Sequence, residues 1–324
     1  MKACVFGAGA IGGHLAGRLA QGGAEVSVVV RGANLAAIRD RGLTVHTPDT
    51  TIHCTPTATD DPARLEPQDV VFVSVKAPAL PSVAAAIGPL LGPDTAVVFV
   101  MNGIPWWYHY TGNDAAPGIP LLDPDGALQR VVGFRRAVGG VVYSACTVQE
   151  PGVVKVENAR NRLVLGEPAG AISPRIEALA EPLRAGGLVI ETTDRIRDAV
   201  WAKLMLNLGS GMLGVLTASA PRDFYTEDAC QAATRAVLAE AEALAAALGC
   251  PVKPDADGQI RNGTRSAHKT SILQDLELGR PMEIDALYTV PLAMGREAGV
   301  ATPTLDLLTS LTRARARAAG LYAG

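Results

Sequence analysis

A glycine-rich turn close to the first residue is the earliest pattern in the chain that could bind a ligand. Its glycines are spaced as G-x-G-x-x-G, and the motif comprises Gly7, Ala8, Gly9, Ala10, Ile11 and Gly12. In this spacing one glycine permits a tight turn, another lets the backbone approach a pyrophosphate, and the third lets a helix pack on a strand. The helix that follows would direct unpaired N–H groups and the positive end of its dipole at the phosphates. The motif therefore predicts dinucleotide binding.

Arg31 indicates which dinucleotide is bound. An NAD site places Asp or Glu about 20 residues after the glycines, where it binds the ribose 2′-hydroxyl. Here Arg31 stands 19 positions after Gly12, directly after the apolar run 25–30. A guanidinium suits a 2′-phosphate, although a solvated charge at a strand end is the alternative interpretation. The residue favours NADPH as the cofactor.

Two more polar residues follow predicted buried strands. Lys76 comes directly after the run 70–75, and Asn102 comes shortly after the run 96–100. Ligands of open α/β sheets bind beyond the carboxyl ends of the strands. We expect both side chains near the nicotinamide or the substrate. The alternatives are an exposed lysine and an ordinary turn residue before glycine.

The second half of the chain contains residues suited to acid–base chemistry. Lys203 and Asn207 are four positions apart in an otherwise almost wholly apolar predicted helix, so they share a face. Lysine suits proton transfer because desolvation lowers its pKa, and a placed general acid gives about 10²–10⁴ in rate. A lysine that extends along the apolar surface into solvent is the alternative. Glu283 falls in the first turn of a later predicted helix, where a carboxylate is ordinarily a helix-dipole partner.

These residues need two kinds of scaffold. Alternating apolar runs and helical stretches predict a mostly parallel sheet up to residue 194, built on strands 3–6, 25–30, 70–75 and 96–100. The runs 138–143, 153–156 and 163–165 suggest an antiparallel extension, followed by a helix at 173–185 and a strand at 188–192. From residue 195 strand signals nearly vanish. We therefore expect an α/β Rossmann-type dinucleotide-binding domain at 1–194 and an all-α substrate and catalytic domain at 195–324.

The segment 106–130 interrupts the first domain. It begins with three aromatic residues and a histidine at positions 106–109 and continues with a polar stretch rich in Pro, Gly and Asp. Loops of this length are usually functional or disordered. Two interpretations are open: the segment is a lid or pocket wall, or it is a surface excursion that covers its own hydrophobic patch.

Composition excludes several classes of protein. A formal charge of −3 and 4% aromatic residues argue against a nucleic-acid partner. Five scattered cysteines without a C-x-x-C pair predict isolated thiols and no metal site. The sequence shows no signal peptide and no uninterrupted apolar stretch of about 18 residues. We expect a cytoplasmic protein without a membrane partner; a homodimer is left open.

Taken together, these segments resemble the ketopantoate reductase family (2-dehydropantoate 2-reductase). The matching segments, in the family's order over nearly the full length, are GAGAIGG at 7–13, Arg31, SVKA at 74–77, NG at 102–103, KLMLN at 203–207, SILQDLELGRPMEID at 271–285 and GVATPTLDLL at 299–308. The penultimate segment is the most specific, since nothing in helix physics requires it.

The resemblance implies NADPH-dependent reduction of a small 2-oxo acid, 2-dehydropantoate (ketopantoate), to (R)-pantoate. Lys203 would be the general acid that protonates the carbonyl oxygen. Asn207 and Ser271 would hold the substrate's carboxylate and hydroxyl, and Glu283 would position the substrate or the lysine.

The resemblance also implies roles for residues that follow the strands. The glycine motif and Arg31 would bind the cofactor, and Lys76 and Asn102 would lie near the nicotinamide, with Asn102 also at the substrate.

Two departures concern the substrate. The family's second asparagine, four residues after the first, is replaced here by Gly211, which we expect to open space. The aromatic insert after Gly103 is also not part of the usual short connection. Both leave open a reductase of another, bulkier 2-oxo acid, and a non-catalytic NADPH-binding sensor is a third interpretation.

Overall fold

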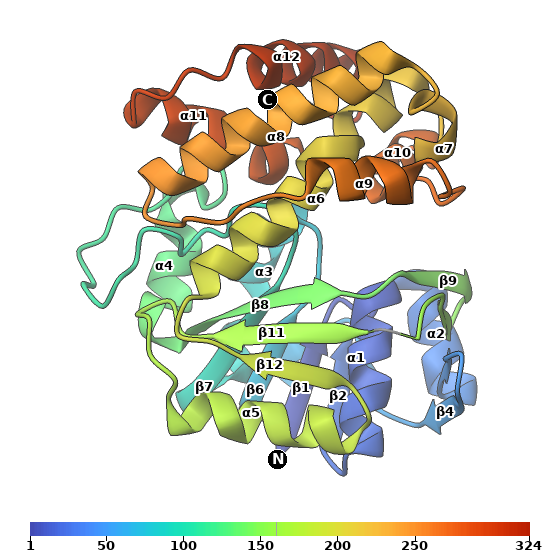
Figure 1. Ribbon diagram of the computed structural model, residues 1–324. Helices are drawn as coiled ribbons and strands as arrows, with labels where there is room; N and C mark the ends of the chain where they lie inside the picture. The colour runs from blue at the N-terminus through green and yellow to red at the C-terminus, as the bar shows by residue number, and fades with distance from the viewer. Residues whose placement is uncertain (160) are drawn as a thin grey trace. The chain divides into compact units, whose positions relative to one another are not determined.

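The chain folds into two compact units. The computed structural model describes residues 1–159 and 161–324. The first unit comprises Met1–Met101 and Pro105–Ile196, and the second comprises Asn102–Ile104 and Arg197–Gly324. All strands of the described residues lie in the first unit, and the second is helical, which confirms the predicted fold class (Figure 1).

An eight-stranded sheet forms the centre of the first unit, in the order β12-β11-β8-β7-β6-β1-β2-β5. Its strands are β1 (Lys2–Phe6), β2 (Glu25–Val29), β5 (Thr57–Thr59), β6 (Gln68–Val73), β7 (Leu91–Val100), β8 (Ala137–Tyr143), β11 (Arg162–Gly166) and β12 (Val189–Thr192). Neighbours pair in parallel except β11, which pairs antiparallel with β8. Valine-rich strands such as β6 suit this position because both faces of a parallel sheet are buried.

A second sheet of four strands lies apart from the first, in the order β4-β3-β10-β9. It contains β3 (Leu43–His46), β4 (Thr51–Cys54), β9 (Cys146–Glu150) and β10 (Val153–Val156). The prediction that the run 153–156 extends the main sheet is therefore wrong. The reason is a hairpin: Gly152, at φ +79°, turns β9 back onto β10, and β10 then pairs with β3.

Among the described residues, five α-helices lie wholly in the first unit. They are α1 (Ala10–Gln21), α2 (Gly32–Arg41), α3 (Leu80–Ala86), α4 (Ala127–Val131) and α5 (Pro174–Ala185). Helix α1 contacts strands of both sheets and also α5. The buried Arg18 of α1 donates through Nη1 to the carbonyl of Gly186 (2.9 Å), which ties α1 to the end of α5.

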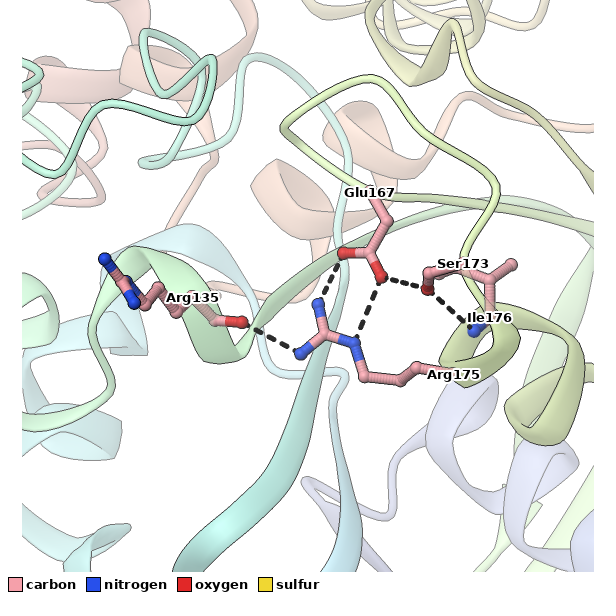
Figure 2. A network of polar contacts seen from close by, with 5 residues as sticks. All are labelled: Arg135, Glu167, Ser173, Arg175 and Ile176. Carbon is pink, nitrogen blue, oxygen red and sulfur yellow. Dashed lines mark hydrogen bonds and ion pairs between the residues drawn. The ribbon is translucent and has the colours of Figure 1, made fainter.

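The start of α5 is held by a polar network around Glu167 (Figure 2). Ser173 caps the helix by accepting from the Ile176 amide (3.3 Å), and its hydroxyl donates to Glu167 (2.6 Å). The Arg175 guanidinium donates twice to the Glu167 carboxylate and once to the carbonyl of Arg135 (2.8 Å). Glu167 is buried, so these donors satisfy a carboxylate that would otherwise be costly to desolvate.

The aromatic residues that follow Gly103 are packed inside the protein. Trp106 and Trp107 are each 1% exposed. The Trp106 ring stacks on Phe134 with centroids 5.2 Å apart, and Tyr110 stacks on the same ring at 4.9 Å. The rings at the start of 106–130 are therefore part of the buried core of the first unit. The segment ends in a short 3₁₀ turn (Pro124–Gly126) and in α4.

The second unit is built from helices. They are α6 (Ile196–Thr217, which begins in the first unit), α7 (Pro221–Phe224), α8 (Asp228–Ala247), α9 (Ala256–Gly263), α10 (Ser271–Glu277), the π-helix η6 (Asp285–Thr289), α11 (Val290–Glu297) and α12 (Pro303–Ala318). Helix α8 packs against α9 and α12. Within the described residues, α6 is long and apolar enough to cross a membrane by length and composition. However, 61% of its most apolar window is buried, and the core helix of a globular protein meets the same criteria.

Candidate active site

Four parallel strands end in one row at one edge of the large sheet. Phe6 pairs with Val29 of β2 and with Val73 of β6, and Val73 pairs with Phe99 of β7. The residues singled out in the sequence come within three residues of these strand ends. They are Gly7 after β1, Arg31 after β2, Lys76 after β6 and Asn102 after β7. Strand β6 ends at Val73, two residues earlier than predicted, because the chain turns at Ser74 to support the glycine motif.

The glycines of the motif are required by close backbone contacts. Gly7 has φ +102°, a conformation that favours glycine. A Cβ on Gly12 would lie 2.2 Å from the carbonyl oxygen of Gly7 and 2.4 Å from Oγ of Ser74. The Ser74 hydroxyl in turn donates to that carbonyl (3.0 Å). Ser74 thus supports the glycine turn, a role that its place in the segment SVKA does not reveal.

Gly9 has different surroundings. It is the N-cap of α1, no side chain caps the helix, and a Cβ placed on Gly9 would meet nothing within 4 Å. Open space over an uncapped helix N-terminus, next to a tightly packed turn, is the arrangement that accepts a pyrophosphate. The glycine turn therefore fits a dinucleotide by its own geometry.

Arg31 is the N-cap of α2 and its side chain is exposed at the end of β2. Gly32 follows at φ +61°, so the chain turns sharply after the arginine. Together with the glycine turn and Lys76, Arg31 belongs to the first unit.

The remaining candidates belong to the second unit. Helix α6 carries Lys203 and Asn207 one turn apart, both half-buried, on the shared face that the sequence predicts. The same face continues through Gly211 and Gly214. A lysine held within an apolar helix is suited to donating a proton.

Asn102 and Glu283 are brought close to one element, the π-helix η6. The Ile104 amide donates to the carbonyl of Ala286 (2.8 Å), and a Cβ on Gly103 would lie 2.4 Å from the same oxygen. The segment that begins with Asn102 thus packs on η6. Glu283 lies two residues before η6 and is 6% exposed. Single π-turns are frequent at functional sites.

Ser271 is the first residue of α10, which ends before Gly279 as predicted. Its side chain is exposed. The next residue, Ile272, lies 3.5 Å from the position of a Cβ on Gly211, so α10 starts beside α6. Asn102, Lys203, Asn207, Ser271 and Glu283 thus all belong to the second unit.

The expectation that Gly211 opens space is wrong. A Cβ at this position would lie 2.5 Å from the hydroxyl of Tyr288, which fills the site from η6. Tyr288 is 0% exposed, and burial, followed by the nearby Glu283 carboxylate, raises its pKa above the ordinary value. The sequence had no signal for this, because only the fold brings η6 against α6.

The described residues offer no metal site and no disulfide. No group of three or more His, Cys, Asp or Glu side chains that could hold a metal ion occurs among the residues the structure describes. The five cysteines are free, with Cys4 and Cys250 buried and the other three half-buried.

Comparison with known proteins agrees with this arrangement. The family model "Ketopantoate reductase PanE/ApbA" matches residues 3–170, and "Ketopantoate reductase PanE/ApbA C terminal" matches residues 195–316. A 2-dehydropantoate 2-reductase from Mesorhizobium japonicum is 39% identical, over 99% of this chain and 100% of the relative.

Solved structures are similar over the same length. A putative ketopantoate reductase from Ralstonia solanacearum has a TM-score of 0.91 and 40% identity, covering 99% of both chains. A PanE/ApbA family ketopantoate reductase from Ralstonia eutropha has a TM-score of 0.84 and 28% identity, covering 99% of this chain and 100% of its own. The chain belongs to the ketopantoate reductase family.

Proposed function

We propose that this protein reduces 2-dehydropantoate to (R)-pantoate with NADPH, and that Lys203 is the general acid. The observation that carries the proposal is the set of polar residues around α6 and η6, with Lys203 and Asn207 on one helix face and Glu283 before the π-helix. Membership of the ketopantoate reductase family supports the same reaction.

The cofactor would be held mainly by residues of the first unit, with Asn102 as a contact from the second unit. Gly9 leaves room for the pyrophosphate at the start of α1, and Arg31 would bind the 2′-phosphate. Lys76 and Asn102, which follow β6 and β7, would lie toward the nicotinamide. When bound, NADPH supplies the hydride that reduces the 2-oxo carbon.

The chain's own residues would bind the substrate and move one proton. Lys203 would donate a proton to the carbonyl oxygen, where negative charge develops, and a cationic group there stabilises the transition state. Asn207 and Ser271 would bind the carboxylate and hydroxyl, Asn102 would contact the substrate, and Glu283 would orient it or the lysine.

Two observations support the smaller 2-oxo acid over a bulkier one. The hydroxyl of Tyr288 occupies the site beside Gly211, and the rings of the aromatic segment are buried within the protein. We therefore propose the smaller 2-oxo acid. We also propose that the enzyme acts in the cytoplasm. A homodimer is the assembly to test first, by light scattering of the purified protein.

The test is NADPH consumption, followed by absorbance, with 2-dehydropantoate and a series of bulkier 2-oxo acids, and NADH as the alternative cofactor. We expect the highest kcat/KM with 2-dehydropantoate and NADPH. A maximum on a bulkier acid would replace the proposed substrate. NADPH binding without turnover on any acid would favour the sensor instead.

A further inference from the structure

The hydroxyl of Tyr288 is a buried polar group without a hydrogen-bond partner among the described residues. The side chain is 0% exposed, and its oxygen lies against Gly211 of α6. A buried hydroxyl left unpaired costs about 1–3 kcal/mol, so native proteins rarely keep one without a reason.

Other unpartnered atoms lie along the same helix face. Nδ2 of Asn207, one turn before Gly211, is also buried without a partner. Oγ1 of Thr270 is a third such atom, and it lies 3.0 Å from the position of a Cβ on Gly214. Unpaired groups of α6, η6 and the start of α10 thus follow one another along the face that carries Lys203.

We propose that Tyr288 is a substrate-binding residue whose hydroxyl pairs with a hydroxyl group of the 2-oxo acid. This inference rests on the proposed function. A substrate held at its reacting end by Lys203 and Asn207 would extend along α6 toward Gly211, and the absence of a side chain at Gly211 is what admits the phenol.

The chemistry of the site favours a hydroxyl as the partner. Burial keeps the phenol protonated by raising its pKa, so it both donates and accepts. The Glu283 carboxylate acts on the same phenol, and its negative charge disfavours a second carboxylate there. A substrate hydroxyl satisfies both the donor and the acceptor.

The chain offers a matched control. Tyr225 is also buried, at 1% exposure, but its hydroxyl donates to the carbonyl of Gly209 in α6 (2.9 Å). Tyr225→Phe removes a protein hydrogen bond, whereas Tyr288→Phe removes none among the described residues. If Tyr288 had only a structural role, Tyr288→Phe should therefore have the same kind of effect as Tyr225→Phe.

The experiment compares the wild type, Tyr288→Phe and Tyr225→Phe on 2-dehydropantoate and on 3,3-dimethyl-2-oxobutanoate, which lacks the 4-hydroxyl. We expect Tyr288→Phe to lower kcat/KM for 2-dehydropantoate by about 10-fold to 100-fold, mainly through KM, and to leave the analogue unchanged. Its Tm should equal or exceed that of the wild type. Tyr225→Phe should lower Tm and keep the wild-type preference between the two acids.

The outcomes separate the two proposals. A wild type that consumes NADPH with neither acid overturns the proposed function and this inference with it. An active wild type whose preference for 2-dehydropantoate is unchanged in Tyr288→Phe overturns the inference alone. An equal loss on both acids also overturns it, because the phenol would then act without the substrate's hydroxyl.

Discussion

Gly9 and Gly12 lie in the same turn, yet a methyl group would meet different surroundings at each. At Gly9 the added Cβ enters open space, while at Gly12 it lies 2.2 Å from a backbone oxygen. The fold therefore requires glycine at position 12 but not at position 9, and we propose that the pyrophosphate of the cofactor is what requires Gly9.

We accordingly expect Gly9→Ala to weaken NADPH binding by about tenfold or more, equal to about 1.4 kcal/mol, with no loss of stability. Gly12→Ala should lower the free energy of unfolding by about 1–3 kcal/mol and weaken binding as a consequence. Calorimetric titration with NADPH and urea unfolding measure the two effects. Unchanged affinity in Gly9→Ala would show that the pyrophosphate lies elsewhere.

The effect of Gly211→Ala on the free energy of unfolding should change sign with the side chain at position 288. In the wild type, Gly211→Ala places Cβ 2.5 Å from the Tyr288 hydroxyl and should lower the free energy of unfolding by about 1–3 kcal/mol. With Tyr288→Phe, the nearest atoms are Cγ2 of Ile272 at 3.5 Å and Cζ of the ring at 3.7 Å, which are ordinary contacts. In that background, alanine at position 211 should stabilise α6 relative to glycine by up to about 1 kcal/mol.

Urea unfolding of the two single variants and the double variant measures this coupling. Additive effects would mean that the phenol moves away from Gly211 at little cost.

Residue types could be predicted from the sequence where chemistry dictates them locally. The glycine motif, Arg31, and the pair formed by Lys203 and Asn207 lie at the strand ends and on the helix face where spacing places them. Tyr288 could not be found in this way. Its hydroxyl lies against Gly211, which is far away in the sequence, and the pattern of residues within η6 does not predict that contact.

At the scale of elements, α1 depends on a buried histidine. His14 is 1% exposed, and its Nε2 accepts from Nε of Arg18 (3.2 Å). Burial, and secondarily the charge of Arg18, lowers the pKa of His14 from 6.5 to about 4. The folded protein therefore keeps this imidazole neutral in a range where the unfolded chain protonates it.

Because the unfolded state binds the extra proton, His14 should contribute stability that is fully present above pH 6.5 and is lost as the pH falls toward 4. The loss amounts to about 3 kcal/mol. Urea unfolding across this range should give a shallower pH dependence for His14→Gln, which keeps an acceptor for Arg18. Substitution of the exposed His53 by Gln serves as the control. An unchanged slope in His14→Gln would contradict the assignment.

Elements differ in how well their sequences reveal them. Strands β1, β6 and β7 have continuous buried apolar runs and were predicted. Strands β3 and β4 were missed because Thr and His alternate with their few buried residues, and β9 was missed because none of its residues is buried. The π-helix η6 was also missed, since its wider turn is set by packing against α6 and the Asn102 segment.

At the scale of the whole molecule, a single boundary near Asp194 would require the chain to pass between the units once. The chain passes between them two further times. The short segment Asn102–Ile104 is grouped with the second unit. The hydrogen bond from Ile104 to Ala286 accounts for this, and it is a long-range contact that composition cannot show. We propose that this crossing lets Asn102, which follows a cofactor-side strand, take part in a substrate site built on helices.

We propose above that Lys203 donates the proton during NADPH-dependent reduction of 2-dehydropantoate. The most direct test is kcat for Lys203→Ala, with the Kd for NADPH measured on the same preparation. We predict a fall in kcat of about 10²–10⁴ with an unchanged Kd, because Lys203 lies in a different unit from the glycine turn. A variant that keeps the wild-type kcat would contradict the account.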